Sequence, residues 1–214
     1  MPRRIVPLVK NEVYHIFSRS IAEFVIFNNN EEYRRMMETI KFYNTTKPPC
    51  KFSIYKELAA PNNEPGGKEK LVDILAYCLM PTHFHMVLKE TDYGNITKFI
   101  HSVLNSYSQY FNTRHLRHGP LWQSRFKNVL VKDDIQLLHV TRYLHLNPVT
   151  AFIINSPDGW KYSSYMEYMG LLEDSDKICN FSQYIAIEKK SYEKFVKDRI
   201  GYQRDLAMIK AHCL

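Results

Sequence analysis

The sequence predicts an α+β fold in which an antiparallel sheet is flanked by helices. Short segments that alternate apolar and polar residues predict strands, and longer segments with apolar residues every three or four positions predict helices. These segments follow one another in the order βαβββαβα, which favours a sandwich built on an antiparallel sheet. The chain has 214 residues, enough for one substantial core, because single domains usually run to about 100 to 200 residues.

The first half of the chain contains four of the predicted strands and one helix. Residues 12–19 alternate and are rich in β-branched and aromatic side chains, which predicts a strand. Residues 28–44 open with asparagines and early acidic residues, as helices do. Further strands are expected at 50–59, 71–80 and 82–90. The last of these is expected to pair antiparallel with its neighbour, after a break at a proline.

The second half is expected to hold two amphipathic helices around one strand. Helical spacing of apolar residues covers 95–115 and 135–147, and a possible strand lies between them at 125–132. The composition changes near residue 170. We therefore expect a main domain at 1–170 and a charged, helical appendix at 171–214.

Charge and cysteine content narrow the class of protein. The net charge is +7 and the isoelectric point is near 9.1, which suits a polyanionic partner. The four cysteines are scattered without a CxxC pair, which argues against a zinc ribbon and a disulfide framework and favours a reduced, cytoplasmic setting. No apolar run is long enough for a signal peptide or a membrane span.

Two histidines, His83 and His85, stand one residue apart in a predicted strand. Because side chains alternate across a strand, both imidazoles project from the same face. Two neutral imidazoles form half of a site for a divalent metal, and a third donor must come from elsewhere in the fold. The alternative is that both are half-buried structural residues bonded to backbone or water.

A predicted helix offers the missing donor types. Tyr143 and Asn147 are four residues apart and share one helical face, and His139 lies one turn earlier. A carboxamide oxygen suits a hard cation, and a tyrosine beside that ion can act as a nucleophile. The alternative is that both are structural, because asparagine before a proline, here Pro148, is a common helix terminator.

The span from Gly94 to Lys132 contains no acidic residue and concentrates the positive charge. Its basic residues alternate with Trp122 and Phe126, a mixture that suits phosphate contacts and base stacking on a single strand. The alternative is a solvated basic loop with a buried tryptophan.

Four motifs in this order resemble those of the single-tyrosine transposases of the HUH superfamily, in the branch associated with repetitive extragenic palindromes (REP). They are MPTHFHMVL, YFNTRHLRHGPLWQSRFKNVLV, RYLHLNPVTAFI and GWKYSSY. The opening YHIFSRSIAEFVIFNNNEEYRRM also looks like the first strand and helix of that family. The resemblance therefore covers roughly Val13 to Gly170 and leaves the C-terminal appendix unmatched.

The resemblance implies a ferredoxin-like or RRM-like sandwich and an enzyme, a DNA strand transferase. His83, His85 and Asn147 correspond to ligands of Mg²⁺ or Mn²⁺, and Tyr143 corresponds to the nucleophile. The implied reaction cuts and rejoins single-stranded DNA at hairpin-bearing sites through a 5′-phosphotyrosine, and the enzyme is a monomer or homodimer. Charge and position suggest the DNA-contacting residues: Arg19, Arg114, Trp122, Arg125 and Lys127.

Three alternatives stay open at this point. Tyr107 and Tyr110 are competing candidates for the nucleophile, although their neighbours suggest helix packing. A noncatalytic single-strand binder would keep the sheet and the basic residues while His83 and His85 serve only the structure. A metallohydrolase would use a zinc-bound water at the two histidines.

Overall fold

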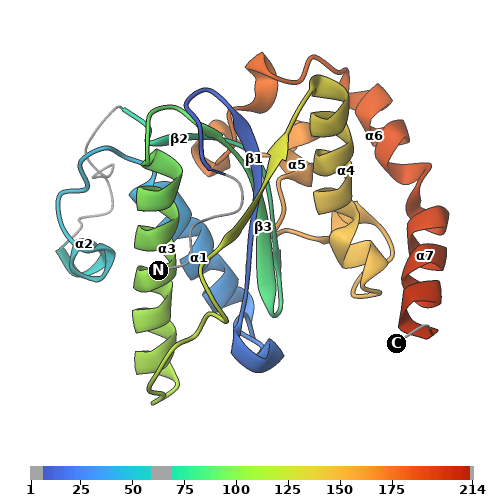
Figure 1. Cartoon of the computed structure of the whole chain (residues 1–214). Helices are drawn as coiled ribbons and strands as arrows, with labels where there is room; N and C mark the ends of the chain where they lie inside the picture. The colour runs from blue at the N-terminus through green and yellow to red at the C-terminus, as the bar shows by residue number, and fades with distance from the viewer. Residues whose placement is uncertain (1–6, 59–68, 213–214) are drawn as a thin grey trace.

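A four-stranded sheet with helices on both faces forms the centre of the molecule (Figure 1). The computed structural model describes residues 7–58 and 69–212. The strands are β1 (Val13–Arg19), β2 (Val72–Met80), β3 (His83–Glu90) and β4 (Lys127–Val131). All neighbouring pairs are antiparallel, in the order β2-β3-β1-β4. This is the strand order of a ferredoxin-like sandwich, and it confirms the predicted α+β class.

The first layer consists of α1 (Asn30–Tyr43) and α3 (Asn95–Arg114), which cover one face of the sheet (Figure 1). The Asn29 side chain caps α1 by accepting hydrogen bonds from two backbone N–H groups. The apolar side chains predicted from helical spacing in α3 are buried: Ile96, Phe99, Ile100, Val103, Leu104, Tyr107 and Phe111. Helix α3 therefore follows the sequence prediction closely.

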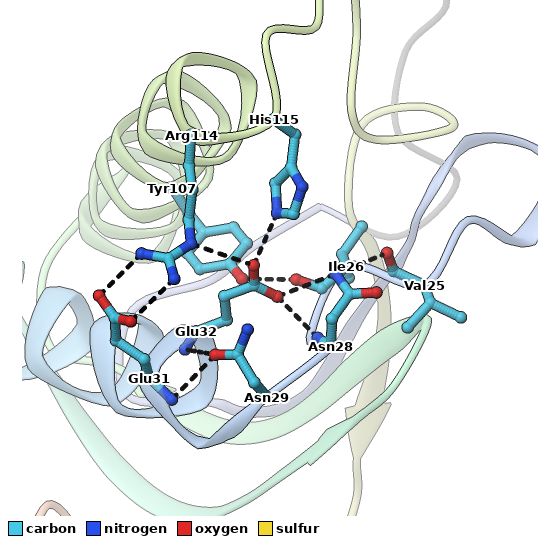
Figure 2. A network of polar contacts seen from close by, with 9 residues as sticks. All are labelled: Val25, Ile26, Asn28, Asn29, Glu31, Glu32, Tyr107, Arg114 and His115. Carbon is cyan, nitrogen blue, oxygen red and sulfur yellow. Dashed lines mark hydrogen bonds and ion pairs between the residues drawn. The ribbon is translucent and has the colours of Figure 1, made fainter.

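A buried carboxylate joins the start of α1 to the end of α3 (Figure 2). Glu32 accepts hydrogen bonds from the backbone N and the Nδ2 of Asn28, at 2.6 and 2.9 Å, and its Oε1 lies 2.6 Å from His115 Nε2. Burial alone would raise the pKa of Glu32, but the hydrogen bonds from Asn28 and His115 outweigh burial and lower it. The first layer is thereby fixed at this end by a charged group.

The second layer covers only part of the opposite face. Helix α4 (Asp134–Thr150) packs mainly over β2 and β3, and α5 (Tyr165–Tyr168), α6 (Lys189–Lys197) and α7 (Ile200–His212) lie on the same side of the sheet (Figure 1). Beyond α4, the same face of β1 and β4 stays more open. Val129 on β4 is 49% exposed. The candidate site lies at this border between covered and open sheet.

Two sequence expectations are wrong. Residues 50–59 were expected to form a strand, but α2 (Phe52–Leu58) occupies this region. Phe52 and Tyr55 both place their rings about 5 Å from the Phe42 ring, which a helical three-residue spacing allows and a strand does not. Helix α4 also does not end at Asn147. It continues through the buried Pro148 to Thr150.

The described part of the C-terminal segment docks against α4. Tyr192 of α6 is buried, and its hydroxyl lies 2.8 Å from Nδ1 of His145 in α4. Arg204 of α7 donates to the carbonyls of Val149 and Ile154 at 3.2 and 2.9 Å. The helices expected in 171–214 are therefore present and contact the helix that carries Tyr143. No helix in residues 7–58 and 69–212 is long and apolar enough to cross a membrane.

Candidate active site

Three imidazoles meet on the partly open face of the sheet. His83 and His85 project from β3, and their ring centroids are 5.1 Å apart. His15 of the neighbouring strand β1 lies beside them, with its ring stacked 5.1 Å from that of His85. The pairing of β1 with β3 brings these rings together. Phe17 pairs with His85, and His15 lies two residues before Phe17 on the same face of β1. We call His15, His83 and His85 the imidazole cluster.

In both histidines of β3, Nδ1 is the ring nitrogen that takes part in a hydrogen bond. His83 Nδ1 lies 3.0 Å from Thr82 Oγ1, and His85 Nδ1 lies 2.9 Å from His15 Nε2. Within the described residues, Nε2 of His83 and of His85 takes part in no hydrogen bond. Metal-binding histidines commonly engage one ring nitrogen with a neighbour and coordinate through the other. The pair is therefore oriented as metal ligands would be.

The imidazole cluster is neutral at neutral pH. Burial lowers the pKa of His15 to about 4, and burial together with the Arg19 charge lowers that of His83 to about 4. Burial, followed by the charges of its neighbours, lowers the pKa of His85 well below its usual value. Neutral imidazoles keep the lone pair that coordination requires.

Helix α4 brings Tyr143 to the same place. The Tyr143 ring centroid lies 5.6 Å from that of His85 and 6.1 Å from that of His15, with both ring pairs nearly perpendicular. The side chain is 44% exposed, so a substrate can reach it. Burial raises the pKa of the Tyr143 phenol, and the Asn147 amide and the Arg19 charge oppose that rise.

Asn147 supplies an amide on the same side of α4. Its Nδ2 is buried and has no hydrogen-bond partner within the described residues. In that part of the chain, no three His, Cys, Asp or Glu side chains are grouped to hold a metal. A divalent ion at His83 and His85 therefore needs a different third donor, and the oxygen of the Asn147 amide is of a suitable type. Two imidazole nitrogens and an amide oxygen are donor types that suit a divalent metal.

Three of the basic residues expected to contact DNA lie close to the imidazole cluster. Arg19, Arg125 and Lys127 line one small cavity together with Phe17. The Phe17 ring is 5.8 Å from that of His85, so this cavity adjoins the cluster. The site therefore has a cationic border next to the candidate nucleophile.

The other two expected DNA contacts lie in the first layer, across the sheet from Tyr143. Arg114 forms a bidentate ion pair with Glu31 at 2.8 Å for each hydrogen bond (Figure 2). The Trp122 indole donates to the Leu104 carbonyl at 3.3 Å, and its ring packs edge-on against Phe84. The structure does not bring these two residues to the imidazole cluster.

The competing tyrosines also lie in the first layer. The Tyr107 hydroxyl donates to the Ile26 carbonyl at 2.5 Å and is buried, and the Tyr110 hydroxyl is buried as well. Neither reaches the imidazole cluster. His139, expected one turn from Tyr143, instead packs its ring against Phe195 of α6 at 5.7 Å.

Sequence reasoning missed His15. The residue stands alone in its segment, and no local spacing links it to the histidine pair. The available signal was the alternation of strand 12–19, which gives His15, Phe17 and Arg19 a common face. Only the pairing of β1 with β3 puts that face beside His83 and His85.

Comparison with known proteins agrees with the resemblance. Residues 64–147 match a family model described as "Transposase IS200 like". A curated protein of Haemophilus influenzae, named as a candidate REP-associated tyrosine transposase, is 27% identical in a 103-residue alignment that covers 44% of this chain. The match covers 58% of that relative's length.

A solved structure shares the fold. It is the REP-associated tyrosine transposase bound to a REP hairpin, with a TM-score of 0.51, 14% identity, and coverage of 88% of this chain and 98% of that one. The family match includes the segment from His83 to Asn147 that builds most of the site. The predicted resemblance to the single-tyrosine transposases, in their REP-associated branch, is confirmed by these comparisons.

Proposed function

We propose that this protein is a metal-dependent DNA strand transferase that cuts and rejoins single-stranded DNA at hairpin-bearing sites through a 5′-phosphotyrosine. The observation that carries the proposal is the meeting of Tyr143 with the histidine pair, at 5.6 Å between the ring centroids of Tyr143 and His85. A helix and a strand far apart in sequence bring a nucleophile and two metal-type donors to one accessible place. The similarity to REP-associated transposases supports DNA as the substrate.

His83, His85 and Asn147 would hold Mg²⁺ or Mn²⁺. When bound there, the ion supplies charge stabilisation to the scissile phosphate. Arg19, Arg125 and Lys127 would hold neighbouring phosphates, and so align the strand over the site. Alignment alone can supply several kcal/mol of the barrier reduction, about 7 to 11 in the best cases.

Tyr143 would attack the phosphorus through its phenol oxygen. An O–P bond to Tyr143 forms, the bond from phosphorus to the 3′ oxygen breaks, the phenol loses its proton, and the departing oxygen gains one. The products are a 5′-phosphotyrosine and a free 3′-OH. Because the phosphodiester linkage is conserved, a second 3′-OH can reverse the step and join strands without ATP.

Arg19 has a second role in this scheme. A phenol has an ordinary pKa of about 10 and is mostly protonated at neutral pH. Burial raises the pKa of Tyr143 further, and the Arg19 charge acts in the opposite sense. Arg19 would therefore both contact phosphate and favour the reactive phenolate.

Adduct formation on labelled hairpin oligonucleotides tests the proposal. With Mn²⁺, the wild-type protein should become covalently attached to the fragment on the 3′ side of the cut. Tyr143→Phe should abolish the adduct and still bind the DNA, whereas Tyr93→Phe, at a tyrosine that is 76% exposed, should behave as wild type. An adduct that persists in Tyr143→Phe would refute the assignment of the nucleophile.

Two other functions give different results in the same assay. A noncatalytic single-strand binder would bind DNA with and without Tyr143 and form no adduct. A metallohydrolase would release free fragments, and its cleavage would continue in Tyr143→Phe. Within residues 7–58 and 69–212, no contact favours either function over the strand transferase.

A further inference from the structure

A second polar groove lies in the first layer, across the sheet from Tyr143. It is a cavity of about 530 Å³ between α1, α2 and α3. Its lining includes the basic residues Arg35, Lys51 and Arg114, and no aspartate or glutamate. We call it the α1–α3 groove. It shares no residue with the cavity next to the imidazole cluster.

Arg35 is the unusual residue of this groove. Its guanidinium lies 4.2 Å from the Phe52 ring centroid and 5.0 Å from that of Tyr110, so two aromatic rings hold it in place. The guanidinium takes part in no hydrogen bond or ion pair with the described residues, and its Nε is buried without a partner. Burial lowers the pKa of Arg35, because removal from water disfavours its charged form.

The nearby carboxylates are already engaged. Glu38, whose charge acts most strongly to raise the Arg35 pKa, is paired with Lys56 at 3.0 Å. Glu31 is paired with Arg114 in bidentate geometry (Figure 2). The protein thus compensates Arg114 and leaves the guanidinium of Arg35 without an anion. An anionic ligand in the groove would supply that partner.

Helix α3 gives the groove a row of neutral hydrogen-bonding groups. They recur every one to four residues along the helix: Ser102, Asn105, Ser106, Gln109 and Thr113. From first to last they span about 16 Å at 1.5 Å per residue. That length corresponds to roughly five nucleotide steps of a B-form strand at about 3.4 Å each. Arginine together with serine, threonine, asparagine and glutamine is the usual set of side chains that contact DNA phosphates.

We propose that the α1–α3 groove binds the phosphodiester backbone of the DNA substrate, with Arg35 as its central phosphate contact. This inference rests on the proposed function for the nature of the ligand. Because the groove and Tyr143 lie on opposite sides of the sheet, the bound segment differs from the one that is cut. The groove would therefore add affinity and fix the position of the substrate without taking part in the chemistry.

Binding measured by fluorescence anisotropy tests the groove, in a Tyr143→Phe background that forms no adduct. Arg35→Gln should weaken binding of a labelled hairpin with flanks by about five- to tenfold. It should also reduce the slope of log affinity against log salt by about one. Gln109→Glu places a carboxylate in the groove at an exposed position and should weaken binding similarly. The matched control is Gln183→Glu, the same change at an exposed site outside the groove.

Three oligonucleotides identify the bound segment: the full hairpin, the hairpin without flanks, and a single-stranded flank. Loss of affinity in the groove variants for any of these supports the proposal and shows whether stem or flank is bound. If both groove variants bind all three DNAs as Gln183→Glu does, the groove is not a DNA contact. Failure of the proposed function looks different, because Arg35-dependent binding would persist while protein with Tyr143 intact forms no adduct.

Discussion

His15 should be needed for full metal affinity although it is not expected to touch the metal. If His85 coordinates through Nε2, its proton must sit on Nδ1, which then donates to His15 Nε2 at 2.9 Å. Removing that acceptor leaves a buried N–H unpaired, because His85 is only 7% exposed. Loss of such partners typically weakens metal binding 10- to 100-fold, or about 1.4 to 2.7 kcal/mol.

The change to make is His15→Phe, which keeps a ring and removes the acceptor. His15→Gln, whose amide can reach a similar position, should restore most of the affinity. Val129→Ala is the matched control, since Val129 pairs with His15 in the sheet and its strand β4 is separated from β3 by β1. Mn²⁺ affinity can be measured from the electron paramagnetic resonance signal of free Mn²⁺, with thermal melting as a check on folding. A folded His15→Phe with wild-type affinity would refute the positioning role.

Further predictions concern the surrounding framework. Tyr192→Phe should leave Nδ1 of the fully buried His145 unpaired and lower the free energy of unfolding by about 1 to 3 kcal/mol in urea titrations. Glu32 has a lowered pKa in the folded protein, so its stabilisation is present above its ordinary pKa of 4.5 and is lost as pH falls through the folded value. Glu32→Gln should therefore be less stable at pH 7, and its free energy of unfolding should change less as the pH falls. Arg19→Gln should raise the pKa of Tyr143 and move the pH profile of adduct formation to higher pH.

Some helices and strands can be predicted from the sequence and others cannot, for physical reasons. The strand with His83 and His85 and the helix at 95–115 are predicted well, because a periodicity of two or of 3.6 is a local property. The strand predicted at 50–59 failed because its aromatic residues pack on Phe42, which the sequence does not link to them. The spacing of Tyr143 and Asn147 predicts a shared helical face but not what that face meets.

The candidate site, too, can be predicted from the sequence only in part. Two of its imidazoles are visible as a pair, whereas His15 joins them only through strand pairing 70 residues apart. The prediction that Arg114 contacts DNA rests on the absence of acidic residues from its own segment. Its acidic partner Glu31 lies 83 residues earlier and engages it fully. A charge count over one segment therefore misses an ion pair with another helix of the same layer.

The C-terminal segment, to which the sequence assigns no clear role, contacts the helix that carries Tyr143. Helix α4 presents Tyr143 and Asn147 toward the sheet and buries His145 on another side. Both ring nitrogens of His145 are engaged, with Ser164 Oγ at 2.8 Å and with Tyr192 of α6 at 2.8 Å. Burial lowers the pKa of His145 to about 3, so this bridge stays neutral and intact at neutral pH. A displacement of about 1 Å can reduce catalysis about 100-fold, so the proposed role of Tyr143 requires contacts that fix α4. If Tyr143 is the nucleophile as proposed, the C-terminal helices help to fix its position through their contacts with α4.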